Sequence, residues 1–504
     1  MHSSKASPIE RVPTPVAIQG SAAQRRAFMV VLSIEVWERF GFYGMAALMV
    51  LFMVQGLGYS DHHANLSWGA LSSLVFAVPA LGGWVGDRWL GARRAMLAGT
   101  VVLACGYALL AASGTVAATL YPALALVAIG VGLFKPNGAN LVRRIYEGQP
   151  ARIDSAFTVY YMGVNIGSTV AMLATPWVSK VWGWGAAFAV SGVGLLLGLL
   201  NYALMRRALE PIARGADATP LSLRRLLVPA LLLLATAMLA LLALRHVELA
   251  AACVVLVGFA VLVAFAVLMR RGDAQERTGL ATSGLLFLQV SLFFVFYQQM
   301  STSLTLFALR NVDPRLHLPG LPALELLPAQ FQALNPIWIM LLSPLLAWLY
   351  EVLARGRGDL PIGLKFALGF AAVAGGFGVF AASGLAGGDG RVPAGFMVGG
   401  YGLISLGELL LSGLGLAVVA RYVPARFSGF MMGAYFAVTG IAMYVGGYVA
   451  NLAQPPGHLV ATPQESLRAY TTLFGRLSLL SLFAALVSLA LLPWLRRFAP
   501  RTAR

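Results

Sequence analysis

Apolar residues fill about fourteen runs of this chain, each roughly 20 residues long, and short polar stretches separate them. A helix of ~20 apolar residues is needed to cross the hydrocarbon core of a bilayer. The pattern therefore predicts an all-α membrane protein with fourteen transmembrane helices. The expected spans are 28–54, 68–86, 95–113, 118–141, 155–176, 184–205, 224–244, 248–269, 281–308, 329–352, 362–384, 394–420, 428–450 and 469–494.

Two central runs, 224–244 and 248–269, differ from the others because they consist almost entirely of Leu, Ala and Val. Such uniform faces favour packing against lipid. Without this pair, six spans lie on each side, as expected for two six-helix bundles around a central cavity. The predicted divisions are a cytoplasmic tail (1–27), an N-terminal six-helix bundle (28–207), a linker with two extra helices (208–280), a C-terminal six-helix bundle (281–494) and a cytoplasmic tail (495–504).

Arginine and lysine gather in every second connection between the runs. Arg88, Arg93 and Arg94 follow the second run, whereas the connections 55–67 and 385–393 carry little positive charge. Basic loops stay on the cytoplasmic side of a membrane. The alternation therefore predicts an even number of spans and places both termini in the cytoplasm.

The composition supports a multi-pass membrane protein. The chain is 59% hydrophobic and 11% charged with a mean hydropathy of +0.79, whereas soluble domains are about 25% charged. Its net charge of +17 does not indicate nucleic-acid binding, because the basic residues lie in short loops and form no basic face. Cys105 and Cys253 lie inside apolar runs, so neither a disulfide framework nor a metal site is expected.

A few ionisable residues lie inside the apolar runs. Glu35, Glu38 and Arg39 share one helical stripe of the first run, Lys135 precedes Pro136 in the fourth, and Glu408 is the single carboxylate of its run. A charge at the centre of a bilayer costs ~2.5–3.5 kcal/mol, so such groups need partners or water. They predict a proton or substrate pathway through a polar interior.

The connection after the second run reads GGWVGDRWLGARR from Gly82 to Arg94. It resembles the loop signature of the major facilitator superfamily, which implies that fold. An acid at a helix end with flanking arginines can hold neighbouring helix ends together until the transporter opens. The resemblance thus implies a gating role for Asp87, Arg88 and Arg93.

Three further stretches resemble the proton-dependent oligopeptide transporter family, also called the POT or PTR family. These are EVWERFGFYG at 35–44, GLFKPN at 132–137 and DSAFTVYYMGVNIG at 154–167. LGELLLS at 406–412 and FMMG at 430–433 match the family in the second half of the chain. The resemblance spans the whole chain, and bacterial members typically carry the extra central pair. It therefore implies a bacterial inner-membrane protein.

The resemblance also implies roles for individual residues. Arg39 and Lys135 would receive the terminal carboxylate of a peptide, and Glu408 with Asn165 and Asn335 would hold its amino terminus. For each asparagine, hydrogen bonding between helices is the alternative. Aromatic residues could line the side-chain pockets, although packing in the core is an alternative for each. The implied proton-coupling residues are Glu35, Glu38, Arg39, Lys135 and Glu408; the implied substrate-binding residues are Arg39, Tyr43, Lys135, Tyr161, Asn165, Gln298, Asn335, Glu408 and Tyr435, with Trp338 as a further aromatic.

The chain departs from the family pattern at several positions. Ala46 and Gln298 stand where many members carry an arginine and a glutamate that pair outside the cavity, so this pair cannot be the gate or the proton switch here. Two family tyrosines are replaced by Phe42 and Phe76, which removes two hydroxyl groups from the cavity. Gly413 replaces a proline, and Tyr435 stands where tryptophan is commoner.

These observations predict a proton-coupled symporter that imports dipeptides and tripeptides by alternating access, with protons as the coupling ion and no cofactor or metal. It is expected to work as a monomer within membrane lipid. The alternatives are the same fold carrying nitrate or another small anion, or exporting a modified peptide. An enzyme is not expected, because neither HExxH nor a GxSxG motif with a partner histidine occurs.

Overall fold

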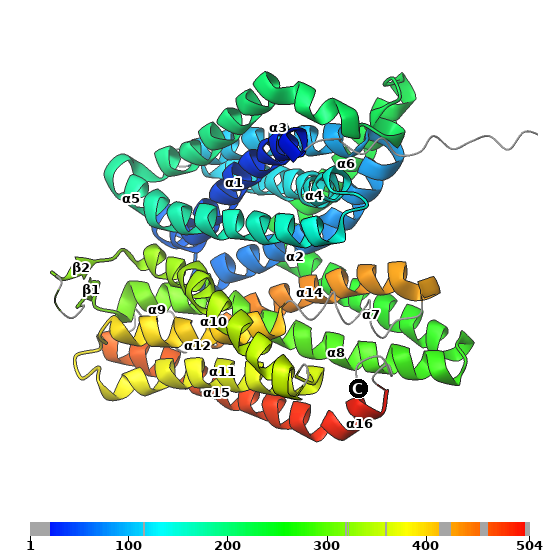
Figure 1. Cartoon of the computed structure of the whole chain (residues 1–504). Helices are drawn as coiled ribbons and strands as arrows, with labels where there is room; N and C mark the ends of the chain where they lie inside the picture. Colours follow the sequence, from blue (N-terminus) through cyan, green and yellow to red (C-terminus); the bar gives the residue numbers. More distant parts are fainter. Residues whose placement is uncertain are drawn as a thin grey trace, which may run out of the picture.

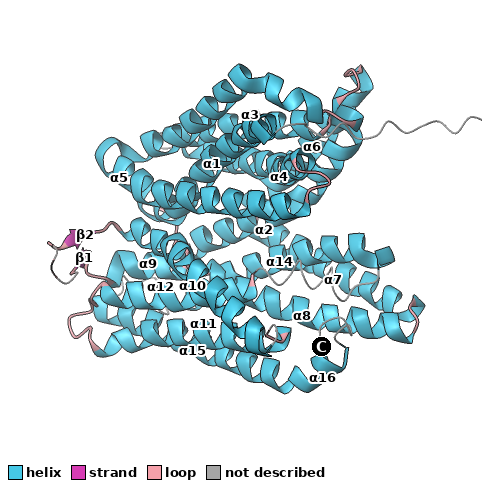
Figure 2. Cartoon of the chain, in the orientation of Figure 1, coloured by secondary structure: helices cyan, strands magenta, loops and turns pink. Residues whose placement is uncertain are grey.

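The structure is a computed structural model that describes residues 21–113, 116–317, 320, 322–357, 360–412, 425–453 and 462–498. Helices make up nearly all of the described chain, and a short antiparallel pair, β1 (Arg315–Leu316) with β2 (Leu324–Glu325), lies at one end (Figure 2). Twelve helical stretches in the described part are long and apolar enough to cross a membrane. The predicted all-α membrane class is confirmed.

The helices form two layers, which Figure 1 shows one above the other. The N-terminal layer consists of α1–α5 and the C-terminal layer of α8–α16. The elements of the N-terminal layer are α1 (Ser21–Leu51), η1 (Phe52–Gly56), α2 (Asp61–Val85), η2 (Gly86–Leu90), α3 (Ala92–Ala112), η3 (Ala117–Thr119), α4 (Leu120–Ile145) and α5 (Pro150–Met205).

The linker contains η4 (Arg206–Ile212), η5 (Gly215–Asp217), α6 (Leu223–Arg245) and α7 (Val247–Arg271). The elements of the C-terminal layer are α8 (Ala274–Gln298), α9 (Ser303–Asn311), η6 (Pro328–Ala333), α10 (Leu334–Arg357), α11 (Ile362–Ala382), η7 (Ser383–Leu385), α12 (Gly395–Leu411), η8 (Ala425–Phe427), α14 (Ser428–Ala450), η9 (Asn451–Ala453), α15 (Pro463–Ala490) and α16 (Leu492–Phe498).

Each layer is held by helix pairs that pack along much of their length. In the N-terminal layer α1 packs on α5 and α3 on α4; in the C-terminal layer α11 packs on α12 and α15. The layers meet where α2 packs on α14. Glycines allow this close approach, since a Cβ on Gly69 would lie 3.2 Å from the Tyr444 carbonyl oxygen and 3.5 Å from the Gly447 Cα.

The extra central helices are divided between the layers. α6 packs against α4 and α2, whereas α7 packs against α14 and α8. Ala250 is the one buried residue among the described residues of α7, as expected of a helix that faces lipid. The Tyr444 hydroxyl of α14 donates to the Val247 carbonyl at 3.2 Å, close to the turn between α6 and α7.

Helix boundaries differ from the sequence prediction at several places. α1 begins at Ser21, so residues 21–27 are helical rather than a tail, and the buried Gln24 side chain donates to the Ile145 carbonyl at 3.4 Å. The predicted separation of the runs 155–176 and 184–205 is retained: the element labelled α5 consists of two helices that meet at Gly183, where the backbone is not helical (φ 85°) and the chain turns. Run 281–308 is instead broken into α8 and α9.

Parts of some predictions lie outside the described residues. These are the tails at 1–20 and 499–504, the end of the run 394–420, and Gly413. The division into two bundles, a linker and two tails stays a prediction at the level of its boundaries.

Candidate substrate cavity

A cavity of about 220 Å³ lies between the two layers. This is slightly below the ~300–1,000 Å³ of pockets for drug-sized ligands, so it suits a small ligand. Six of the predicted substrate-binding residues line it together: Arg39, Tyr43, Lys135, Gln298, Asn335 and Glu408. They come from α1, α4, α8, α10 and α12, so both layers contribute.

The α1 side of the cavity follows from helical spacing. Arg39, Phe42, Tyr43 and Ala46 recur at three- and four-residue intervals, and all four line the cavity. The opposite face of α1 packs in the core, where Val30, Val31 and Ile34 are fully buried. The predicted polar stripe of α1 therefore faces the interior of the protein and not lipid.

Two acids and an arginine form a buried ion cluster beside the cavity. Arg39 Nε lies 3.1 Å from Glu35 Oε1 and 2.5 Å from Glu38 Oε2. The Glu38 side chain is fully buried, and neither of its carboxylate oxygens has a hydrogen bond with good geometry. Two carboxylates thus share one guanidinium, which leaves the trio with a formal charge of −1 when both acids are ionised.

Lys135 supplies the second cation of the cavity. Its Nζ lies 5.3 Å from the centre of the Phe76 ring. The position of this part of α4 is fixed by Asn137, whose Nδ2 donates to the Gly82 carbonyl of α2 at 3.1 Å and to the Leu133 carbonyl at 2.7 Å. The bond to Gly82 joins α4 to α2 beside Pro136, which has no N–H to donate to the helix.

Glu408 faces the cavity from the C-terminal layer. Asn335 Nδ2 donates to Glu408 Oε2 at 2.7 Å and is 3.0 Å from Ser405 Oγ. Asn335 therefore joins α10 to α12 and also orients the carboxylate that lines the cavity. Asn335 thus forms the hydrogen bonds between helices that were the alternative to substrate binding, and it also lines the cavity.

Other predicted residues lie away from the cavity lining. The Asn165 Nδ2 donates to the Tyr161 carbonyl of its own helix at 2.8 Å. The Tyr435 ring packs on Phe287 with centroids 5.5 Å apart, and Trp338 Nε1 donates to the Val398 carbonyl at 3.0 Å. Tyr435 and Trp338 contact other residues of the C-terminal layer in this structure, and their roles in substrate binding stay predictions.

Gln332 and Ser72, two uncharged polar residues that were not predicted from the sequence, also line the cavity. Gln332 Nε2 donates to the Ala47 carbonyl at 3.1 Å and to Thr305 Oγ1 at 2.9 Å. Ser72 Oγ accepts from Gln298 Nε2 at 3.2 Å, across the boundary between α2 and α8. Neutral polar residues disturb the hydropathy pattern little, so no sequence signal distinguished them. The Gln298–Ser72 bond is a neutral contact in the region where the family ion pair is missing.

One end of the boundary between the layers is closed by polar contacts, which we call the latch. Its main part is a two-pronged ion pair in which Arg310 nitrogens lie 2.5 and 2.7 Å from the Asp61 oxygens. Asn65 Nδ2 also donates to Asn451 Oδ1 at 2.9 Å. The latch lies at the end that bears the weakly charged loops 55–67 and 385–393.

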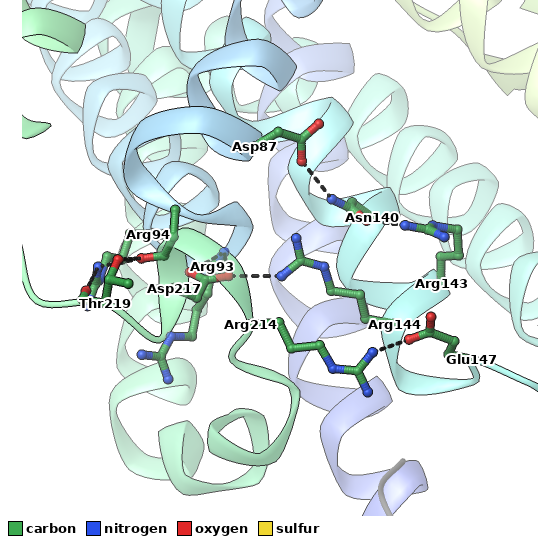
Figure 3. A network of polar contacts seen from close by, with 11 residues as sticks. Asp87, Arg93, Arg94, Asn140, Arg143, Arg144, Glu147, Arg214, Asp217 and Thr219 are labelled. Carbon is green, nitrogen blue, oxygen red and sulfur yellow. Dashed lines mark hydrogen bonds and ion pairs between the residues drawn. The ribbon is translucent and has the colours of Figure 1, made fainter. Parts of the chain in front are cut away.

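The opposite end carries a polar network that we call the clasp (Figure 3). The Asp217 carboxylate in the linker lies 3.1 Å from Arg144 NH1 and accepts from the Arg93 backbone N–H at 3.2 Å. Arg94 NH1 donates to the carbonyls of Ala216 and Thr219 at 3.1 and 2.9 Å. Every one of these contacts ties the linker to the N-terminal layer.

Two of the predicted gating residues, Asp87 and Arg93, lie in the region of the clasp. Asp87 accepts from Asn140 Nδ2 at 3.3 Å, and Arg93 contributes its backbone N–H to Asp217. Gly91 adopts φ 90°, and a Cβ there would collide with Asp217. Asp217 was not predicted, because a single acid in a linker belongs to no motif and to no helical stripe. The clasp contacts anchor the linker, and a gating role stays a prediction.

Comparison with known proteins agrees with this geometry. A model of the POT family matches residues 93–464. Dipeptide and tripeptide permease A of Escherichia coli (strain K12) is 38% identical over 487 residues, covering 96% of this chain and 95% of that protein. The protein of the same name from Erwinia pyrifoliae is 41% identical over 478 residues, covering 94% of this chain and 95% of that protein.

Solved structures give the same result. A bacterial homologue of the human drug peptide transporters PepT1 and PepT2 is 46% identical with a TM-score of 0.85, covering 94% of this chain and 100% of that chain. Tetrameric PepTSo2 is 46% identical with a TM-score of 0.86 at the same coverage. These similarities confirm the predicted fold.

Proposed function

The chain belongs to the POT family of proton-coupled peptide transporters and is a di- and tripeptide permease of the membrane, and we propose that its cavity binds the peptide by the two charged ends. In this proposal Arg39 and Lys135 receive the carboxylate, and Glu408 receives the ammonium group. Peptides of different sequence share these ends, so such a site accepts many side chains. The observation that carries the proposal is that these three charged groups line one cavity.

The balance of charge supports proton coupling at the carboxylate end. Glu35, Glu38, Arg39 and Lys135 sum to zero when all are ionised. A peptide carboxylate brings one further negative charge into a low-dielectric site, where uncompensated charge is costly. A proton on Glu38 or Glu35 would cancel it and release Arg39 toward the peptide. Close acids and bases titrate as a set, so the proton belongs to the cluster.

The latch supports an inward-facing state, provided that the basic loops and both termini are cytoplasmic. The latch then closes the external end, while the clasp contacts of the described residues hold the linker against the N-terminal layer. Transport would require the latch to open so that peptide and proton enter together from outside. The transmembrane potential adds ~2.3 kcal/mol per charge per 100 mV to such uptake.

Among the alternatives, a simple anion such as nitrate is less favoured by the charges. Glu408 would repel it, and the Asn335–Glu408 pair would have no function. Export of a modified peptide uses the same two ends and is distinguished by the direction of coupling.

We propose that one chain is the transport unit, because its own two layers enclose the cavity and supply both the cations and the carboxylate that the proposal needs. PepTSo2 is tetrameric, so assembly of several such units is compatible with this proposal. No nucleic acid takes part in it.

The decisive experiment is uptake of labelled alanyl-alanine into proteoliposomes, with an acidic exterior and a negative interior. We expect the labelled peptide to accumulate above its external concentration. Unlabelled dipeptide and tripeptide should inhibit this uptake, whereas free alanine and nitrate should not. Glu408→Gln should weaken competition by free dipeptide more than by N-acetylated dipeptide. Inhibition by nitrate at the same concentration as dipeptide would contradict the proposal.

A further inference from the structure

Each of the two cations in the cavity lies against the ring of a phenylalanine. The guanidinium carbon of Arg39 is 5.9 Å from the Phe42 ring centre, and Lys135 Nζ is 5.3 Å from the Phe76 ring centre. Both rings line the cavity. An aromatic ring attracts a cation that lies over its face within about 6 Å, and more strongly in a desolvated site.

Phe42 and Phe76 are also the two positions at which the family resemblance implies tyrosine. Both replacements therefore fall on residues that contact the cations. A phenol hydroxyl would offer a hydrogen bond in the cavity, whereas a phenyl ring offers only its face. Among the described residues, the Lys135 ammonium makes no ion pair or hydrogen bond, and the Phe76 ring is its recorded contact. Its three N–H donors are therefore available to a ligand that carries a negative charge.

The ring positions are themselves fixed by aromatic packing. Phe76 packs edge-on against Phe294 of α8 with ring centres 5.6 Å apart, and Phe42 packs edge-on against Tyr43 at the same separation. Each phenylalanine is thus held by a neighbouring ring while its face meets a cation. The two helices that carry them, α1 and α2, belong to the N-terminal layer together with Arg39 and Lys135.

We propose that Phe42 and Phe76 are positioning residues that hold the guanidinium of Arg39 and the ammonium of Lys135, through their ring faces, as a paired receptor for the peptide carboxylate. This inference rests on the proposed function of the cavity. It assigns to the two rings a contribution to affinity that is specific for ligands with a free carboxylate. A role in filling space alone would not distinguish such ligands from others.

The test uses Phe76→Leu, which keeps an apolar side chain, and Phe76→Tyr, which keeps the ring. Binding of alanyl-alanine and of its C-terminal amide is measured by competition in the purified full-length protein. We expect Phe76→Leu to weaken alanyl-alanine by about tenfold, as a desolvated cation–π contact implies, and to leave the affinity for the amide within about twofold. Phe76→Tyr should retain the affinity of the wild-type protein for alanyl-alanine.

Two controls separate positioning from packing. Phe294→Leu alters the same aromatic pair without a cation contact, and it should change the affinities for both ligands by equal factors. In a Lys135→Met background, Phe76→Leu should have no further selective effect. Phe42→Leu with Arg39 retained is expected to parallel Phe76→Leu.

Equal losses for both ligands in Phe76→Leu, or a loss in Phe76→Tyr as large as in Phe76→Leu, would overturn the inference. So would a Phe76→Leu protein that still prefers the free carboxylate as strongly as the wild type. A wild-type protein that binds the amide as tightly as alanyl-alanine would instead refute the proposed function, because the cations would then not receive the carboxylate.

Discussion

Arg39 is the residue on which the charges of the N-terminal layer converge. Its Nε lies within 3.1 Å of one oxygen of Glu35 and 2.5 Å of one oxygen of Glu38. Removing one partner of a buried ion pair is strongly destabilising, at about 3–5 kcal/mol, because a charge is left uncompensated. With two acids and one arginine, however, the neutral form of one acid leaves a balanced pair. Proton uptake by this trio is therefore compatible with a stable fold.

Replacing Glu38 by glutamine should fix the trio in the form that corresponds to a protonated acid. We expect Glu38→Gln to abolish accumulation driven by a pH gradient, with at least a tenfold fall, while exchange of labelled for unlabelled dipeptide continues. Exchange needs no net proton movement, so it reports whether the protein is folded and binds peptide. Proteoliposome uptake and counterflow measure the two activities. Full proton-driven accumulation by this variant would contradict the coupling role of Glu38.

At the scale of elements, the first part of the linker, η5 and α6, packs on the N-terminal layer. The clasp holds η5 against α3 and α4 through a fully buried Asp217 side chain, and α6 continues from it along α4 and α2. The neighbouring helix α7 packs on the C-terminal layer. The extra pair therefore spans both layers, with its turn near the latch.

The clasp should contribute to stability rather than to substrate affinity. Asp217→Asn keeps an acceptor for the Arg93 N–H but removes the charge that faces Arg144, and the cost of breaking a buried ion pair is about 3–5 kcal/mol. We expect the Tm in detergent to fall by several degrees, with dipeptide affinity within about twofold of wild type. Asp217→Asn combined with Arg144→Met should recover part of the loss. A large change in affinity with an unchanged Tm would favour a gating role for this network.

The latch is expected to influence the balance between the two states of the transporter. Its arginine side chain is 35% exposed, so the ion pair is partly screened and worth ~1 kcal/mol at most. Asp61→Asn should therefore shift the population toward the externally open state by no more than about fivefold. Distances between spin labels at the external ends of α2 and α9 measure this shift. The charge exchange of Asp61→Arg with Arg310→Asp should restore the original population. Failure to restore it would indicate that this ion pair does not influence the balance between the two states.

At the scale of the whole molecule, the ion pair that joins the two layers among the described residues is that of the latch. A covalent bond across the latch should therefore stop transport without disturbing either layer. The side chains of Asn65 and Asn451 meet across the boundary in a 2.9 Å hydrogen bond, so we choose these two positions for a cysteine pair. The native Cys105 and Cys253 are first replaced by alanine.

In this background, oxidation of Asn65→Cys with Asn451→Cys should abolish uptake, and reduction should restore it. The matched control is Asn311→Cys with Ser466→Cys, which links α9 to α15 within one layer and should leave uptake unchanged after oxidation. Proteoliposome uptake before and after reduction checks both pairs. Sustained uptake by a fully oxidised Asn65–Asn451 pair would show that the layers need not separate at the latch.

The sequence alone determined the class of the protein, the number of apolar runs and the identity of the charged residues within them. These features follow from the cost of burying charge in a bilayer and from helical spacing, which are local properties of the chain. Motif resemblance added the family and the residues of the cavity. Arg39, Lys135 and Glu408 can therefore be identified as candidate binding residues from the sequence alone.

Tertiary structure decided which residues meet. The partners in Asp61–Arg310 and in Arg144–Asp217 are separated by 249 and 73 positions along the chain, and no spacing rule connects residues so far apart. The same holds for Gln298 with Ser72 and for the Phe76 ring against Lys135, because each pair joins two helices. Phe42 and Arg39, in contrast, are three residues apart on α1, so helical spacing alone brings them together. Tyr435 and Trp338 pack against other residues of the C-terminal layer, and the sequence alone could not show this, since an aromatic residue has the same pattern in a core as in a binding site.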